Sequence, residues 1–155
     1  MIFKVGQQAN VITSTSIKID GFNRLIFDKR ELKAAIRKGG NVVKTEARRL
    51  IARRAVSGAG DLPGRVTGAM SKSIKTNVGS GGGYVRVMPY MTEEMRKYTA
   101  TKKNPKGSFY PAFLFYGTSR GLKPRKDFML QALDNKQVQI RSAISASLLN
   151  AIRTA

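Results

Sequence analysis

Apolar positions recur every three or four residues over two long stretches of the chain, as they do in amphipathic helices. The first predicted helix covers residues 29–54 and follows a candidate N-cap at Asp28. Its apolar stripe consists of Leu32, Ala35, Ile36, Gly39, Val43, Ala47 and Leu50. The adjacent Gly39 and Gly40 each cost about 1 kcal/mol relative to alanine in a helix interior. Because Gly39 lies on the stripe itself, we expect the close approach of another backbone there rather than a kink.

The second predicted helix opens at Asp127 and Phe128 and continues toward the end of the sequence. Its apolar stripe consists of Leu130, Leu133, Ile140, Ile144, Leu148 and Ala151. A third, short helix is predicted over residues 92–98, and a basic loop over residues 99–108 follows it.

Alternating apolar and polar positions predict β-strands at residues 16–20, 74–78 and 84–88, with a further apolar segment at residues 25–27. The last two strands flank the glycine-rich residues 79–83, a pattern typical of the tip of a β-hairpin. These glycines do not indicate a phosphate-binding loop, because neither a Gly-Lys-Ser/Thr sequence nor a predicted helix follows them.

Residues 110–116 are continuously apolar, and we expect them to form a central strand that is buried on both faces. Residues 57–66 are expected to be a flexible, linker-like extension. Together these elements predict a single domain over residues 1–155 with an α+β fold, in which a small, mostly antiparallel sheet packs against two long amphipathic helices, with extended loops. With both helices on one face, the other face needs a cover, which a neighbouring subunit of a ring can supply.

The 155-residue chain carries a formal net charge of +20 and contains no histidine, cysteine or tryptophan. A chain of this length can bury ~70% of its unfolded surface, so it needs no disulfide staple. The lack of cysteine excludes a disulfide scaffold and a thiolate metal site, and it fits assembly in a reducing cytoplasm. No segment approaches the ~20 apolar residues of a membrane span, so we expect no membrane partner. The positive surplus favours an anionic partner, because uncompensated charge destabilises a compact state.

The candidates for catalytic chemistry are weak. General acid-base catalysis usually needs a histidine or a pair of perturbed carboxylates, and the adjacent acids Glu93 and Glu94 are flanked by basic residues. We therefore interpret this pair as a solvated, ion-paired helix face rather than a metal site. Ser71 and Ser73 beside Lys72 could form a serine-lysine dyad, but a helical turn that leads into a strand has the same pattern. We predict no enzymatic activity, no metal and no cofactor.

The basic residues form two groups. The first, here called the basic stripe, follows one side of the first predicted helix over ~30 Å at 1.5 Å per residue, and it consists of Arg30, Lys33, Arg37, Lys44 and Arg48. These charges could follow a phosphate backbone, or they could simply solubilise the helix and pair in part with Glu31 and Glu46. The second group lies in the loops on either side of residues 110–118, and it consists of Lys102, Lys103, Lys106, Arg120, Lys123, Arg125 and Lys126.

Three short segments occur in an order that resembles a known family. Thr67-Gly68 precedes a serine-bearing turn, residues 110–118 read Tyr-Pro-Ala-Phe-Leu-Phe-Tyr-Gly-Thr, and Pro124-Arg-Lys-Asp-Phe128 opens the last helix. They resemble the tail-completion family of long-tailed double-stranded DNA phages, of the minor tail protein Z type. The motif residues are Thr67, Gly68, Tyr110, Phe113, Gly117, Thr118, Pro124 and Phe128. The chain departs from the family pattern in having Phe115 and Tyr116 where an acidic residue usually precedes Gly-Thr, and in having Pro111 after the tyrosine.

The resemblance implies a structural virion protein that is assembled in the host cytoplasm. In the phage neck it would complete the tail and join it to the DNA-filled head, as part of a ring around the DNA channel. A closed homo-oligomeric ring is expected, in which six subunits match the tail and twelve match the portal. The implied partners are the tail tube or tail terminator, the head connector, and genomic double-stranded DNA contacted without sequence preference.

Two alternatives stay open at this point. The chain could be a tail terminator or a head-tail adaptor or stopper ring. It could also be a small basic nucleic-acid-binding protein, although such proteins interleave aromatic with basic residues, and Phe109, Phe113 and Phe115 lie in an apolar run. The residues expected to face DNA or a docking partner are Lys33, Arg37, Lys44, Arg48, Lys102, Lys103, Arg120 and Arg125.

Overall fold

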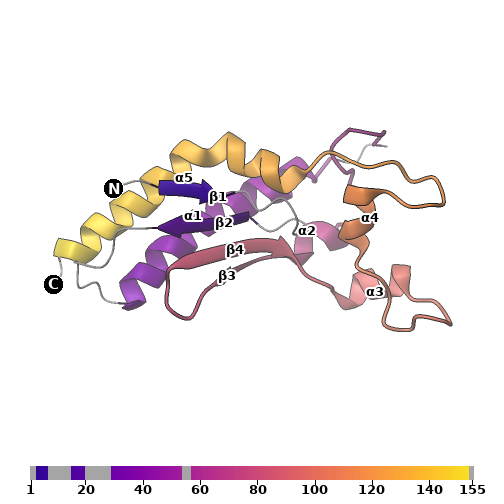
Figure 1. Ribbon diagram of the computed structural model, residues 1–155, viewed down its shortest axis with the longest axis horizontal. Coiled ribbons are helices and arrows are strands. Elements are labelled where there is room, and N and C mark those ends of the chain that lie inside the picture. Colours follow the sequence, from indigo (N-terminus) through magenta and orange to yellow (C-terminus); the bar gives the residue numbers. More distant parts are fainter. Residues whose placement is uncertain (1–2, 7–14, 20–28, 54–56, 154–155) are drawn as a thin grey trace.

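The fold is α+β, as predicted, with two long helices beside a small antiparallel sheet (Figure 1). The computed structural model describes residues 3–6, 15–19, 29–53 and 57–153. Helices α1 (Lys29–Leu50) and α5 (Phe128–Arg153) pack against each other. Three short helices, α2 (Ala69–Ser73), α3 (Glu93–Thr99) and α4 (Tyr110–Tyr116), gather at one end of the molecule. We call this end the short-helix end.

The sheet has four strands in the order β1-β2-β4-β3, and every neighbouring pair is antiparallel. Strands β3 (Ile74–Val78) and β4 (Tyr84–Pro89) form the predicted hairpin, and β2 (Thr15–Ile19) matches the predicted first strand within a residue. Strand β1 (Phe3–Gly6) was not predicted, because four residues show too little alternation to be recognised. The predicted segment at residues 25–27 and the N-cap Asp28 lie outside the described residues.

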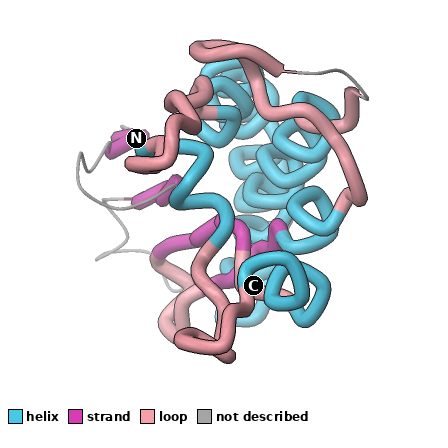
Figure 2. Tube along the Cα trace, turned by 90° about the vertical axis from the view of Figure 1, so that its right-hand side faces the viewer, coloured by secondary structure: helices cyan, strands magenta, loops and turns pink. Residues whose placement is uncertain are grey.

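Both long helices lie on one face of the sheet, α1 over β3 and β4 and α5 beside β2. Figure 2, viewed from the short-helix end, shows the strands on one side of the helices. The predicted stripe of α1 is confirmed, since its members are buried apart from the partly buried Leu32. On α5, Leu133, Ile140, Ile144 and Leu148 are buried as predicted. The side chain of Ala151 lies outside the described residues.

Helix α1 ends at Leu50, four residues before the predicted end. The amide of Ala52 bonds to the carbonyl of Arg49 at 3.2 Å, a three-residue separation that tightens the last turn. Ile51 is buried there, and the chain then leaves the helix axis. The apolar periodicity continued to Ile51, so the sequence pattern alone placed the end too late.

The close approach predicted at Gly39 and Gly40 is confirmed, but side chains make it rather than a backbone. A Cβ atom on Gly39 would lie 2.7 Å from Cδ1 of Ile144 in α5. A Cβ atom on Gly40 would lie 2.7 Å from both Thr76 and Val85 of the sheet. The two glycines therefore let α1 sit close to its two neighbours at once, and the helix continues through them.

The predicted central strand at residues 110–116 is wrong, because these residues form helix α4. Pro111 lies in the first helical turn, where the missing N–H is not needed, whereas a central strand would need that donor. Only Pro111 and Leu114 are buried, and Tyr116 is 64% exposed. A short apolar run does not by itself distinguish a buried strand from a helix that buries one face.

On β3 and β4, the outer face of the sheet is not the apolar surface for which a cover was expected. Strands β3 and β4 turn Ile74, Val85 and Val87 toward the helices, and they leave Lys75, Asn77, Tyr84 and Arg86 exposed on the other side. On these two strands the outer face is therefore largely polar. The ring therefore gains no support from an uncovered apolar sheet.

Residues 57–66 are bonded to the rest of the domain, in contrast to the expected flexible extension. The amide of Gly60 donates to the carbonyl of Pro124 at 3.0 Å, and the amide of Lys126 donates to the carbonyl of Asp61 at 2.9 Å. Pro63 is buried, and Arg65 N bonds to the carbonyl of Arg53 at 2.8 Å. Glycine and proline content suggested a linker, but these residues run alongside the segment that leads into α5.

Candidate functional site

Two of the family-motif segments meet in one pocket at the short-helix end. Thr67 and Gly68 lie just before α2, and Tyr110 opens α4. They line a hollow of about 210 Å³, which we call the motif pocket. Its remaining walls come from Ile51, residues 64–66, the first three residues of α2, and Met95 and Tyr98 of α3.

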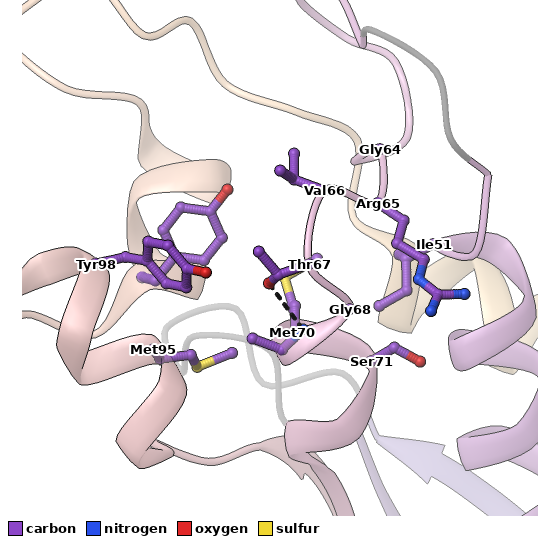
Figure 3. A pocket seen from close by; sticks show the side chains of 12 residues that line it. Ile51, Gly64, Arg65, Val66, Thr67, Gly68, Met70, Ser71, Met95 and Tyr98 are labelled. Carbon is purple, nitrogen blue, oxygen red and sulfur yellow. Dashed lines mark hydrogen bonds between the residues drawn. The ribbon is translucent and has the colours of Figure 1, made fainter.

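The Thr67-Gly68 turn shapes the floor of the motif pocket. Gly68 has a φ of 82°, a left-handed conformation that favours glycine, and its carbonyl accepts from the amide of Lys72 at 3.0 Å. Thr67 Oγ1 accepts from the amide of Ala69 at 3.2 Å, the dashed bond in Figure 3. A side chain at Gly68 would also meet Arg65, because its Cβ would lie 3.1 Å from Nε. Both motif residues therefore have local reasons to be threonine and glycine.

The motif pocket is apolar and open to solvent. Ile51, Met70 and Met95 are buried at its base, whereas Val66 is 90% exposed and Tyr98 is 65% exposed at its mouth. Figure 3 shows Val66 and Tyr98 facing each other across the opening. Methionine side chains adapt their shape to different partners. The arrangement suits the insertion of an apolar side chain from another protein.

Helix α3 supplies one wall of the motif pocket and carries the acidic pair. Thr92 caps the helix by accepting from the amide of Met95 at 3.2 Å. Glu93 binds Arg96 at 2.8 Å, and Glu94 lies 3.9 Å from Lys72, so the predicted ion-paired face is confirmed. Within the described residues no three His, Cys, Asp or Glu side chains come close enough to hold a metal ion.

The other motif residues join α4 to α5 and do not line the motif pocket. Gly117 ends α4 with a φ of 73°, and a side chain there would overlap the carbonyl oxygen of Leu122, which confirms the predicted backbone constraint. Thr118 bonds to Leu122 through both its amide and its hydroxyl. Phe128 is fully buried with its ring centroid 5.8 Å from that of Phe115, as expected for an anchor of α5.

Phe113 and Pro124 have backbone roles in the same junction. The Phe113 carbonyl accepts from Gly117, and the Pro124 carbonyl accepts from Gly60. These five motif residues stabilise the junction between α4 and α5, next to the motif pocket: Phe113, Gly117, Thr118, Pro124 and Phe128. Of the motif residues, Thr67, Gly68 and Tyr110 line the motif pocket itself.

The basic stripe follows the outer edge of β3. Arg48 donates from Nη2 to the carbonyl of Ile74 at 2.9 Å, and the stem of Lys33 lies against Gly82 in the hairpin tip. Between them Arg37 is exposed and Lys44 is half-buried. The sequence did not reveal the role of Asn41, which lies in the same row and accepts from the hydroxyl of Thr76 at 3.2 Å. The stripe is therefore part of the junction between helix and sheet edge.

Glu46 was a possible partner of the basic stripe, but it pairs on another side of α1. Its carboxylate is 4% exposed and accepts from Arg49 Nη2 at 2.7 Å and Nε at 2.9 Å. Asn135 of α5 donates to it at 3.1 Å. The hydrogen bonds from Arg49, with help from Asn135, lower the pKa of Glu46 from 4.5 to about 2 despite the opposing effect of burial. The ion pair with Arg49 lies within α1, and the hydrogen bond from Asn135 links it to α5.

The second basic group lies in two loops at the short-helix end. Lys102 and Lys103 are exposed in the loop before α4, and Arg120 is exposed in the loop after it. Arg125 is half-buried, and its amide donates to the carbonyl of Leu114 at 2.6 Å. Figure 1 shows the two loops on opposite sides of α4.

Comparison of the chain with protein-family models, with curated protein sequences and with solved structures found no match. Among the described helices none combines the length and apolar character required to cross a membrane.

Proposed function

We propose that this protein is a structural component of a phage neck, where it completes the tail and joins it to the DNA-filled head. The observation that carries the proposal is the motif pocket. Thr67-Gly68 and Tyr110 are far apart in the chain, yet they line one apolar hollow whose mouth carries the exposed Val66 and Tyr98. Exposed apolar and aromatic side chains around a pocket are typical of protein interaction sites.

The distribution of charge supports a role in assembly. The loops at the short-helix end expose Lys102, Lys103 and Arg120. An acidic surface of the tail or of the head connector is therefore a suitable partner. The chain acts as part of a closed ring, because a head-to-tail interface between identical subunits ends either in a ring or in a filament. Six subunits match the tail and twelve match the portal. The motif pocket takes an apolar side chain of the next protein in the neck.

The test is complementation of a phage whose copy of this gene is deleted. Electron microscopy of the deletion lysate should show separate full heads and tails, and the wild-type gene should restore joined particles. A double variant, Val66→Asp with Tyr98→Ala, should fail to restore them because it makes the mouth of the motif pocket polar and removes its aromatic wall. The matched control is Val138→Asp on α5, an equally exposed valine away from the pocket, which should restore joining.

Two results contradict the proposal in different ways. If the deletion phage still produced joined, infectious particles, the proposed role in the neck would be wrong. Full complementation by the pocket double variant would leave the neck assignment in place but show that the motif pocket is not its docking site. Tails of uncontrolled length from the deletion phage would indicate the tail-terminator alternative.

A further inference from the structure

Strand β3 is one of the two edges of the sheet, since the strand order ends with it and no described strand lies beyond it (Figure 1). Two backbone hydrogen bonds set the phase of its pairing with β4: Gly79 N donates to the Tyr84 carbonyl at 3.0 Å, and Tyr90 N donates to the Ser73 carbonyl at 3.1 Å. Hydrogen-bonded and non-hydrogen-bonded pairs alternate along an antiparallel ladder. Lys75 and Asn77 therefore direct their backbone groups to β4, and Ile74, Thr76 and Val78 direct theirs outward.

The outward-facing backbone groups are only partly satisfied. The Ile74 amide donates to the Ser71 carbonyl, and the Ile74 carbonyl accepts from Arg48. For Thr76 and Val78, the amide and carbonyl groups have no hydrogen-bond partner among the described residues. Four backbone groups, two donors and two acceptors, thus form an open row at the edge of the sheet. Such a row is a template for pairing with another strand.

Positive charge flanks this open row on both sides. On the helix side lie Arg37 and Lys44 of the basic stripe, and on the outer face of the sheet lie the exposed Lys75 and Arg86. Asn77, Val78, Gly79, Ser80, Tyr84 and Arg86 also line a shallow polar hollow of about 260 Å³ next to the end of β3. No Asp or Glu occurs at the described positions of β3 and β4 or in the helix row that contains Arg37 and Lys44.

We propose that the edge of β3 binds an extended acidic segment of another protein, which adds to the sheet as a fifth strand. Side chains of an added strand alternate between the two faces. One set would meet Arg37 and Lys44, and the other would meet Lys75 and Arg86. Acidic residues on the incoming segment are therefore favoured on both faces. Its backbone forms hydrogen bonds with the free amide and carbonyl groups of Thr76 and Val78.

Charge and hydrogen bonding together disfavour two other occupants. A second copy of the chain, paired through its own β3, would bring the same cations face to face, and like charges in an interface oppose association. The phosphates of duplex DNA could neutralise the cations, but they only accept hydrogen bonds. DNA backbone contact would therefore leave the carbonyls of Thr76 and Val78 unsatisfied. This inference goes beyond the neck assignment and does not depend on it.

The test uses the full-length, isotope-labelled protein and a blocked synthetic peptide of about six residues, the usual length of a strand, in which pairs of Glu alternate with pairs of Val so that Glu reaches both faces; we call it the Glu-Val peptide. Amide hydrogen exchange is followed by NMR as the peptide is added. Exchange at Thr76 and Val78 should slow by about tenfold or more at saturation, because their amides gain partners. The amides of Lys75 and Asn77 already bond to β4 and should change less. A peptide with Lys in place of Glu should have no effect.

Matched charge reversals separate this site from general attraction to a basic protein. The variant Arg37→Glu with Lys44→Glu should weaken binding of the Glu-Val peptide by about tenfold. Lys102→Glu with Lys103→Glu changes the net charge equally but lies in a distant loop, and it should bind as the wild type does. Thr76→Pro removes one outward amide without touching a ladder bond, so it should also weaken binding while the charges stay in place.

The proposal is overturned if the Glu-Val peptide leaves the exchange at Thr76 and Val78 unchanged, or if both charge-reversed variants bind it equally well. The proposal is also overturned by one combined result with duplex DNA. In that result the peptide does not bind, DNA does bind, and Arg37→Gln with Lys44→Gln reduces the log-log slope of DNA affinity against salt concentration by about two. That result would assign the basic stripe to DNA. Because the exchange measurement uses the wild-type protein, these outcomes do not require every variant to fold.

Discussion

Helices α1 and α5 span 22 and 26 residues and bury continuous apolar stripes against each other and the sheet, whereas α2, α3 and α4 span 5, 7 and 7 residues. The short-helix end is organised by backbone bonds and by left-handed glycines such as Gly68 and Gly117. It also leaves Val66, Tyr98 and Tyr116 exposed. The long-helix body is thus stabilised by burial of the two stripes, with Val138 and Leu149 of α5 left exposed, whereas at the short-helix end the exposed Val66 and Tyr98 lie at the mouth of the motif pocket.

This contrast predicts where substitutions destabilise the fold and where they affect binding only. In the body, a changed side chain alters packing or a buried ion pair. At the mouth of the motif pocket, a changed side chain meets solvent in the isolated protein. The following experiments test the contrast in order of decreasing effect on the free energy of unfolding.

The largest effect is expected at the junction of the two regions. Phe128→Ala removes a fully buried ring that contacts Phe115, and it should lower the free energy of unfolding by roughly 3 to 5 kcal/mol. Chemical denaturation measures the change. Tyr116→Ala, which truncates an exposed aromatic residue of α4, is the control and should cost less than about 1 kcal/mol. A comparable loss for both variants would mean that the short-helix end is packed as tightly as the body.

The second effect is a pH dependence that originates at Glu46. Its pKa is about 2 in the folded protein and 4.5 as the ordinary value, so the unfolded chain takes up the proton first as the pH falls. The stabilisation is therefore complete above pH 4.5 and is lost as the pH approaches 2. Since the partner Arg49 is exposed to solvent, we expect a loss of roughly 2 kcal/mol rather than the full value of the shift.

Glu46→Gln isolates this contribution, because it keeps the shape of the side chain and removes the charge. Urea denaturation at a series of pH values should show a shallower acid-side decline for the variant than for the wild type. Parallel profiles would show that the Glu46–Arg49 ion pair of α1, with its hydrogen bond from Asn135 of α5, does not stabilise the body.

A third prediction concerns the contact of α1 with the sheet. Gly40→Ala places a Cβ atom 2.7 Å from both Thr76 and Val85, and the resulting overpacking should outweigh the gain in helix propensity. A net loss of about 1 to 2 kcal/mol is expected from thermal unfolding. Gly81→Ala in the hairpin tip is the matched control, since nothing lies within 4 Å of its Cβ position, and it should leave the stability almost unchanged. Stabilisation by Gly40→Ala would show that α1 can move away from the sheet.

The smallest effect is expected at the mouth of the motif pocket. Val66→Asp with Tyr98→Ala should change the free energy of unfolding by no more than about 0.5 kcal/mol per residue, because both side chains are largely exposed. Denaturation of the isolated double variant measures this. A loss comparable to that of Phe128→Ala would show that these residues support the fold, and the failure of the variant to join heads and tails could then not be attributed to docking.

Local sequence patterns were sufficient to predict the elements whose hydrogen bonds and apolar periodicity lie within a single helix or hairpin. The stripes of α1 and α5 and the β3–β4 hairpin were predicted from short-range signals. The last helix was predicted to open at Asp127, and in the structure Asp127 Oδ1 accepts from the amides of Met129 and Leu130. The left-handed Gly68 and Gly117 also follow from turn chemistry. The α+β class could therefore be predicted from the sequence.

The tertiary structure decided the features that depend on neighbours far away in the chain. In helix α4, Pro111 and Leu114 pack on the core, whereas Tyr116 is exposed. A continuous run of apolar residues does not indicate which of them will be buried. The motif pocket exists only because the segments at Thr67 and Tyr110 fold together. The basic stripe was visible as a row of charges. Its position beside the open edge of β3 depends on the packing of α1 against the sheet, through contacts that no local pattern of residues specifies.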